Sequence, residues 1–97
     1  MKAVMIIYNQ AHTEKVEFML NKLKIRGYTQ WDDVKGRGGV DGVPHLGTHT
    51  WPEINSVSLC IVEHDKLQTL LDGVKKIDAI NEDVGIRAFV WNIEQAV

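Results

Sequence analysis

Cysteine is nearly missing from this 97-residue chain: Cys60 stands alone, so no disulfide can form within it. An excess of one charge is also missing, because 11 basic and 13 acidic residues leave a net charge of −2. The basic residues are scattered, which argues against a nucleic-acid-binding surface. No apolar run approaches the roughly 20 residues that span a bilayer. The short apolar start lacks a small-residue cleavage site. We therefore expect a cytoplasmic protein.

Proline is nearly as scarce as cysteine, and its placement divides the chain. Both prolines, Pro44 and Pro52, and five of the eight glycines fall between Gly36 and Pro52, where no regular element fits that spacing. A loop of this length is uncommon inside a compact domain and usually carries a function. The remaining composition, 44% hydrophobic and 25% charged, is that of a folded protein. We therefore expect one domain over residues 1–97, with a long loop at residues 36–52.

Periodicity predicts four strands and two helices outside that loop. Strands are predicted over residues 3–9, 28–35, 54–62 and 84–93. The first helix carries an apolar stripe at i, i+3, i+4 and i+7, with Thr13 as its N-cap and Gly27 as its stop. Its stripe consists of Val16, Met19, Leu20 and Leu23. The second helix carries a similar stripe of Leu67, Leu70, Leu71, Val74 and Ile77.

The order β-α-β-β-α-β predicts an α+β, ferredoxin-like sandwich, with a four-stranded antiparallel sheet and two helices on one face. The first and last strands are apolar on both faces, but two helices can cover only one. Whichever set faces the helices, the other set would form an exposed patch larger than soluble monomers usually tolerate. The sets are Val4, Ile6 and Tyr8 against Ala3, Met5 and Ile7, and Phe89, Trp91 and Ile93 against Ile86, Ala88 and Val90. We therefore expect self-association through the sheet.

Three short motifs carry a resemblance to a known protein family. Val34-Lys35-Gly36-Arg37-Gly38, which ends a strand and opens the long loop, looks like the V-x-G-x-G start of the PII T-loop. Residues 47–56, read as Gly-Thr-His-Thr-Trp-Pro-Glu-Ile-Asn-Ser, are similar to a divergent PII-like subgroup. Residues 85–92, read as Gly-Ile-Arg-Ala-Phe-Val-Trp-Asn, are similar to the same subgroup. The resemblance covers essentially the whole chain at the level of topology.

The resemblance implies a homotrimer with its sheets facing inward. In PII relatives small effectors, most often adenine nucleotides, bind clefts between subunits beside the base of the T-loop. That loop then contacts a protein partner such as a transporter, a channel or an enzyme. The ligand-binding residues expected here are Lys35, Gly36, Arg37, Gly38, Gly39 and Arg87, and Trp51 is the expected partner contact. The glycines and Arg37 could present backbone N–H groups and a guanidinium to an anion, or could simply make a flexible loop base.

Two features depart from the PII pattern. Typical members carry a T-G-x-x-G-D-G-K loop for phosphates after the second helix, whereas residues 78–85 read Asp-Ala-Ile-Asn-Glu-Asp-Val-Gly. This stretch has one glycine and no lysine, so it suits a polyanion poorly. The long loop also contains no tyrosine for uridylylation.

A divalent metal is the alternative ligand. His45 and His49, at i and i+4, resemble a helical zinc pair, but the neighbouring prolines and Gly47 argue against a helix. Trimer symmetry could gather these histidines, or pair one with His12 or His64; otherwise they are solvated or form turns. The ion-tolerance proteins of the CutA type share this fold and provide the alternative function.

No enzyme is predicted. Asp32 and Asp33 are strand neighbours that point to opposite faces, so they suit shared acid–base chemistry poorly. Cys60 is expected to be a small buried hydrophobe. A third possibility, a ferredoxin-like enzyme of the dimeric monooxygenase kind, would need a polar cavity that these apolar strands do not line.

Overall fold

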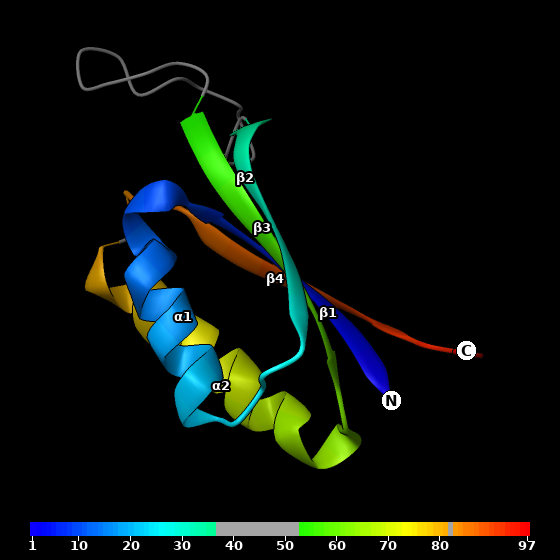
Figure 1. The fold of residues 1–97 in the computed structure, drawn as a ribbon. Coiled ribbons are helices and arrows are strands. Elements are labelled where there is room, and N and C mark those ends of the chain that lie inside the picture. Colours follow the sequence, from blue (N-terminus) through cyan, green and yellow to red (C-terminus); the bar gives the residue numbers. More distant parts are fainter. Residues whose placement is uncertain (37–52, 82) are drawn as a thin grey trace.

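The computed structural model describes residues 1–36, 53–81 and 83–97 (Figure 1). Its strands are β1 (Lys2–Asn9), β2 (Tyr28–Gly36), β3 (Glu53–Val62) and β4 (Ile86–Asn92), and its α-helices are α1 (Thr13–Lys22) and α2 (His64–Ile80). A short 3-10 turn, η1 (Gln10–His12), joins β1 to α1. The predicted element order is thus confirmed, and each strand boundary differs by no more than two residues from the prediction.

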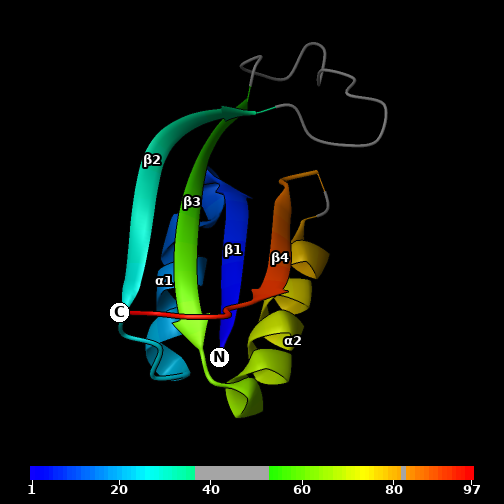
Figure 2. The same cartoon turned by 90° about the vertical axis from the view of Figure 1, so that its right-hand side faces the viewer.

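The four strands form one antiparallel sheet in the order β2-β3-β1-β4. Both helices lie on the same face of this sheet, and the other face carries no element among the described residues (Figures 1 and 2). This arrangement confirms the ferredoxin-like βαββαβ sandwich. No helix among the described residues combines the length and the apolar character needed to cross a membrane.

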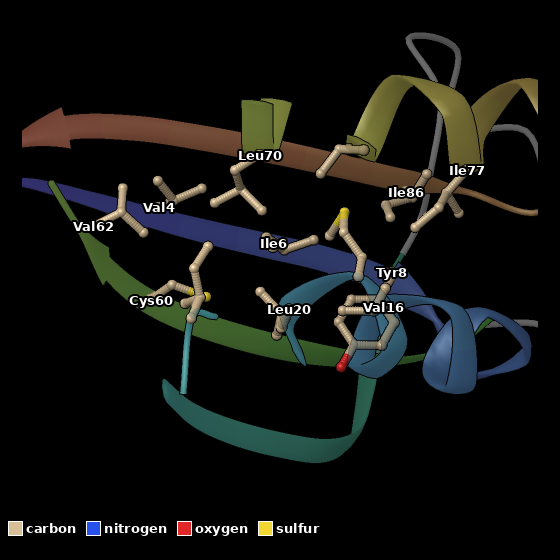
Figure 3. Close-up of a cluster of buried hydrophobic side chains, with 13 residues drawn as sticks. Val4, Ile6, Tyr8, Val16, Leu20, Cys60, Val62, Leu70, Ile77 and Ile86 are labelled. Carbon is tan, nitrogen blue, oxygen red and sulfur yellow. The ribbon is translucent and has the colours of Figure 1, made fainter. Parts of the chain in front are cut away.

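The core lies between the helices and the sheet (Figure 3). From β1 it takes Val4, Ile6 and Tyr8, each at most 1% exposed, so these are the residues of β1 that face the helices. Tyr8 also places a polar atom in this layer: its Oη lies 2.9 Å from the Oγ of Ser58 on β3. Burial raises the pKa of Tyr8, because the phenolate would lose its water shell there.

The face that β3 turns to the helices is its more polar one. In the pairing of β3 with β1, Ser56 lies opposite Tyr8 and Ser58 lies opposite Ile6, and both serines are buried. Each hydroxyl has a partner: Ser58 shares a hydrogen bond with Tyr8, and Ser56 donates to the Oδ1 of Asp32 over 3.0 Å. Because both bonds are made, the core holds these hydroxyls without an unpaired polar group.

The ends of α1 differ from the prediction. Thr13 is the first helical residue rather than the N-cap, and its Oγ1 donates to the carbonyl of Gln10 over 2.8 Å. The helix also ends before Gly27: Lys24 takes a left-handed conformation with φ of 61°, and the N–H of Ile25 returns to the carbonyl of Leu20 over 2.9 Å. This returning bond satisfies a terminal carbonyl as a C-terminal glycine usually would.

The uncovered face of the sheet is apolar, as the alternation in β1 and β4 predicts. Side chains on this face include Ala3, Met5 and Ile7 of β1, Val57, Leu59 and Ile61 of β3, Phe89 and Trp91 of β4, and Trp31 of β2. Several remain about half exposed: Phe89 is 54%, Trp91 46%, Trp31 46% and Ile61 45% exposed. We call this set the open face. It is too apolar and continuous for an ordinary solvent-facing surface.

Candidate functional site

One end of the sheet gathers the described residues that were predicted to bind a ligand. At this end Val34 pairs with Asn55, Asn55 pairs with Asn9, and the N–H of Asn9 donates to the carbonyl of Gly85 over 2.9 Å. The base of the long loop and the segment between α2 and β4 therefore share one level of the sheet. We call this the loop end (Figure 2).

Lys35 and Gly36 finish β2 at the loop end. Lys35 pairs with Ile54 and its side chain is exposed. Gly36 pairs with Glu53, and a Cβ placed on it would come within 2.6 Å of the Nδ2 of Asn55. Since that atom is the end of a flexible amide, a small side chain at this position would only displace it.

A bulge interrupts β2 just before these residues. The pairing with β3 shifts between Trp31 and Val34, and Asp33 takes a left-handed φ of 58°. The Oδ1 of Asp33 accepts a hydrogen bond from the Nε2 of Gln10 over 2.7 Å, while Asp32 accepts from Ser56. The bulge interrupts the alternation that was expected to send the two carboxylates to opposite faces, and each of them has its own hydrogen-bond partner.

Arg87 lies at the opposite side of the loop end, on the edge strand β4. Its Nη1 donates to the carbonyl of Ile86 over 2.9 Å and lies 3.6 Å from the Oδ1 of Asp78 on α2. The side chain is 68% exposed, so this contact with Asp78 is a weak surface ion pair. Arg87 therefore turns toward α2 rather than toward β2, and a ligand would compete with one carboxylate for it.

A buried histidine makes a hydrogen bond to the segment between α2 and β4. His12 is only 2% exposed, and its Nε2 lies 2.8 Å from the carbonyl oxygen of Val84. A carbonyl oxygen can only accept, so Nε2 donates the proton of this bond, and Nδ1 has no partner among the described atoms. The N–H of Val84 in turn donates to the carbonyl of Asn81 over 3.0 Å.

The geometry sets what this site can hold. Three strand spacings separate β2 from β4, which is about 14 Å at about 4.8 Å each. The backbones of Lys35 and Arg87 are separated by at least this distance, so only their long side chains can reach a ligand shared by both. The described residues between α2 and β4 add no cation, because Asn81 and residues 83–85 contain one aspartate and no lysine or arginine.

Most of the predicted site residues fall outside the part of the chain that the structure describes. These residues are Arg37, Gly38, Gly39, His45, His49 and Trp51, and their predicted roles stay predictions. Of the two histidines considered as extra metal ligands, His12 is buried against Val84 and His64 is exposed at the start of α2. Within the ranges that the structure describes, no three potential ligands gather around a metal-sized space.

The sequence analysis did not predict a turn at the loop end or a hollow at the opposite end of the sheet. The first is the η1 turn, which touches both sides of the loop end through the bonds from Gln10 to Asp33 and from His12 to Val84. The second is a basic hollow of about 590 Å³ at the opposite end of the sheet. Its polar lining comes from Lys24, Arg26, Lys66 and Glu63. No local motif predicts either feature, because each one brings together segments that are far apart in the chain.

Comparison with known families gives a match along the whole chain. The family model described as Nitrogen regulatory protein P-II matches residues 1–97. No curated protein sequence matches the chain.

Solved structures give a likeness in fold. CPII, a nitrogen regulatory PII-like protein from Thiomonas intermedia K12 in a structure with ADP, AMP and bicarbonate, aligns with a TM-score of 0.74 and 22% identity, over 95% of this chain and 88% of that chain. Its structure with ADP and bicarbonate aligns with a TM-score of 0.73 and 23% identity, over 95% and 84%. A protein of Thermus thermophilus described as a putative PII-like signaling protein aligns with a TM-score of 0.66 and 18% identity, over 95% and 85%.

Proposed function

The chain belongs to the nitrogen regulatory protein P-II family, and from this membership we propose that it is a regulatory protein that senses an adenine nucleotide between subunits. The observation that carries the proposal is the loop end, where the described ligand-binding candidates Lys35, Gly36 and Arg87 lie at one end of the sheet, on its two edge strands. Its role is signalling rather than catalysis. The family's regulatory character and the separate structural partners of Asp32 and Asp33 support this assignment.

We propose a homotrimer assembled through the open face. Phe89, Trp91, Trp31 and Ile61 are each about half exposed on that face. Burying one large apolar side chain stabilises an assembly by about 1.5–3 kcal/mol before the costs of association. Three copies that turn their sheets inward would remove the whole patch from water. The helices would then remain on the outside.

The proposed effector is an adenine nucleotide, alone or with bicarbonate. CPII of Thiomonas intermedia K12 is bound to ADP and bicarbonate in one structure and also to AMP in another. In the present chain Lys35 and Arg87 would meet the phosphates from opposite sides of the loop end, together with Gly36 and the undescribed Arg37, Gly38 and Gly39. An extended ligand of this kind suits the separation of about 14 Å between β2 and β4.

The charge for the phosphates must come from outside the segment between α2 and β4. That segment contains no lysine or arginine, and Arg87 is shared with Asp78. A neighbouring subunit is the natural source of further cations in a site between subunits. The basic hollow formed by Lys24, Arg26 and Lys66 is the best candidate on this chain, because its three cations outnumber its one acid, Glu63.

Residues 37–52 are proposed to act as the T-loop that carries the signal to a protein target, such as a transporter or an enzyme, with Trp51 as a contact. A ligand that favours one loop state over another would shift the population of that state. The metal-binding alternative at His45 and His49 is included in the test of the proposal, since those residues lie outside the described part.

A thermal-shift experiment tests the proposal. The purified protein is heated with ADP, AMP, bicarbonate, zinc or copper, each as the only addition. A ligand at 100 times its dissociation constant stabilises the native state by about 2.7 kcal/mol. We expect a shift with ADP that is reduced in Lys35→Ala and retained in Lys75→Ala, a matched lysine on the exposed side of α2. A shift with zinc or copper alone, lost in His45→Ala or His49→Ala, would replace the nucleotide sensor with the ion-binding function.

A further inference from the structure

A groove of about 660 Å³ is lined by residues 14–23 and by α2, with no residue of a strand among its lining. Both helices lie on one face of the sheet (Figure 1). The helices approach closely beneath it: a Cβ placed on Gly73 of α2 would come within 2.6 Å of the Sδ of Met19 on α1. Because Gly73 has no side chain, the side chain of Met19 occupies the space beside the backbone of α2 at this point. One chain forms the whole groove.

Two large apolar side chains stand exposed in this groove, one from each helix. Phe18 of α1 is 69% exposed and Ile80 of α2 is 63% exposed. Gly73, Ile77 and Ile80 follow one another at i, i+4 and i+7 along α2, so they form one apolar ridge. Neither exposed side chain contributes to the core between helices and sheet. Packing within the chain therefore does not explain why two large apolar side chains, one from each helix, are exposed in the same groove.

Lysines surround the exposed phenylalanine. Lys15 and Lys22 lie at i−3 and i+4 from Phe18, one turn away on each side along α1. Lys76 lines the groove from α2. The two acids of the lining are Glu14 and Asp72, and the Oδ1 of Asp72 already accepts a hydrogen bond from the Nε2 of Gln68 over 2.9 Å. Three lysines against two acids give the lining a net charge of +1, which favours carboxylates on whatever covers the apolar surface.

We propose that the α1–α2 groove is a docking site for an amphipathic helix of a partner protein, whose apolar stripe is flanked by aspartate and glutamate. The apolar ridge of a third helix fits the groove between two packed helices. Phe18 and Ile80 would be buried beneath it. Its acidic flanks would meet Lys15, Lys22 and Lys76. The groove is separate from the loop end, so this contact adds a partner to the one proposed for residues 37–52.

Peptide selection tests this site. A displayed library of helix-forming peptides of about 15 residues is selected on the intact protein, and the enriched peptides are labelled and measured by fluorescence anisotropy. We expect apolar residues at helical spacing with acidic flanks. Affinity should fall at least about tenfold in Phe18→Ser and in Ile80→Ser, and should stay unchanged in Ala79→Ser, an exposed position of α2 outside the groove. Lys22→Glu and Lys76→Glu should also weaken binding, while Lys75→Glu should not.

Other results overturn the proposal. If the enriched peptides bind Phe18→Ser and Ile80→Ser as tightly as the wild type, with both variants folded by circular dichroism, the groove is not their site. Basic flanks on the enriched peptides would contradict the charge argument. Two further outcomes would assign the groove to another occupant. If light scattering shows that the oligomer becomes smaller in Phe18→Ser, the groove binds a second copy of this chain. Phe18-dependent flotation with phosphatidylserine vesicles assigns it to a membrane surface.

Discussion

The Nε2 of His12 donates to the carbonyl oxygen of Val84 over 2.8 Å, joining residues 72 positions apart in the sequence. His12 is 2% exposed, so this bond is made away from water. Three residues earlier, the backbone N–H of Asn9 donates to the carbonyl oxygen of Gly85 over 2.9 Å. The turn between β1 and α1 thus fixes the segment that leads into β4.

Removing this bond should loosen that segment. His12→Phe keeps an aromatic ring but has no N–H, so the Val84 carbonyl loses its donor. We expect the free energy of unfolding to fall by about 1–3 kcal/mol, with faster hydrogen exchange at the Asn9 amide. His64→Phe is the matched control, since His64 is exposed, and should change stability by no more than about 0.5 kcal/mol. Equal effects of the two substitutions in urea unfolding would show that the bond contributes nothing.

Sequence alone could predict the sheet because its signals are local. Alternation in β1 and β4 showed that both faces are apolar, and the structure places Tyr8 toward the helices and Phe89 toward the open face. The role of His12 could not be predicted, because its partner Val84 is distant in sequence. The bulge at Asp33 was missed for the same reason: the left-handed residue is held by Gln10, and its own neighbours carry no turn signal.

Phe18 shows a second kind of limit. The helical pattern identified the core positions Val16, Met19 and Leu20 of α1, all of them buried. Phe18 lies outside the predicted apolar stripe, and the sequence analysis gave it no role. The groove between α1 and α2 depends on how the two helices pack at Gly73 and Met19, and the periodicity of a single helix does not predict that packing.

Cys60 should make stability fall at alkaline pH. It is fully buried, and burial raises the pKa of its thiol from 9.0 to about 11. Between these values the unfolded chain loses the thiol proton while the native state keeps it, so stability falls as pH rises. The raised pKa of Tyr8 acts in the same direction at higher pH.

The expected loss from Cys60 is about 2–3 kcal/mol by the upper end of this range. Urea unfolding of the wild type and of Cys60→Ala across the range measures it. The variant starts from a lower stability and should lack this part of the decline. Native Cys60 should also resist thiol reagents until the protein unfolds. Rapid labelling of the native protein would contradict the assigned burial.

Assembly through the open face predicts a contrast between two phenylalanines. Phe89 is 54% exposed on the open face and Phe18 is 69% exposed on the helices. Phe89→Glu should convert the proposed trimer of 11.0-kDa chains to monomers in light scattering, because a carboxylate would be buried there without a partner. Phe18→Glu should leave the trimer intact. If Phe18→Glu dissociates the protein and Phe89→Glu does not, the sheets do not form the interface.

The ion pair between Asp78 and Arg87 predicts a gain in nucleotide affinity when it is removed. Asp78→Asn would free Arg87 for the phosphates, and the pair is exposed enough that its loss costs little stability. Isothermal titration should find ADP bound more tightly, by up to about fivefold. Asp65→Asn makes the same charge change at the other end of α2 and should leave the affinity unchanged. A gain of equal size in both variants would mean that net charge, and not Arg87, is responsible.

Native mass spectrometry of the protein with and without ADP tests the central claim most directly, because one spectrum gives the oligomer and the number of ligands. We expect a trimer that binds up to three ADP molecules, with ADP absent from the monomers that Phe89→Glu produces. A monomer that binds ADP as well as the wild type does would contradict a site between subunits. A trimer that binds no ADP at saturating concentration would contradict the nucleotide sensor itself.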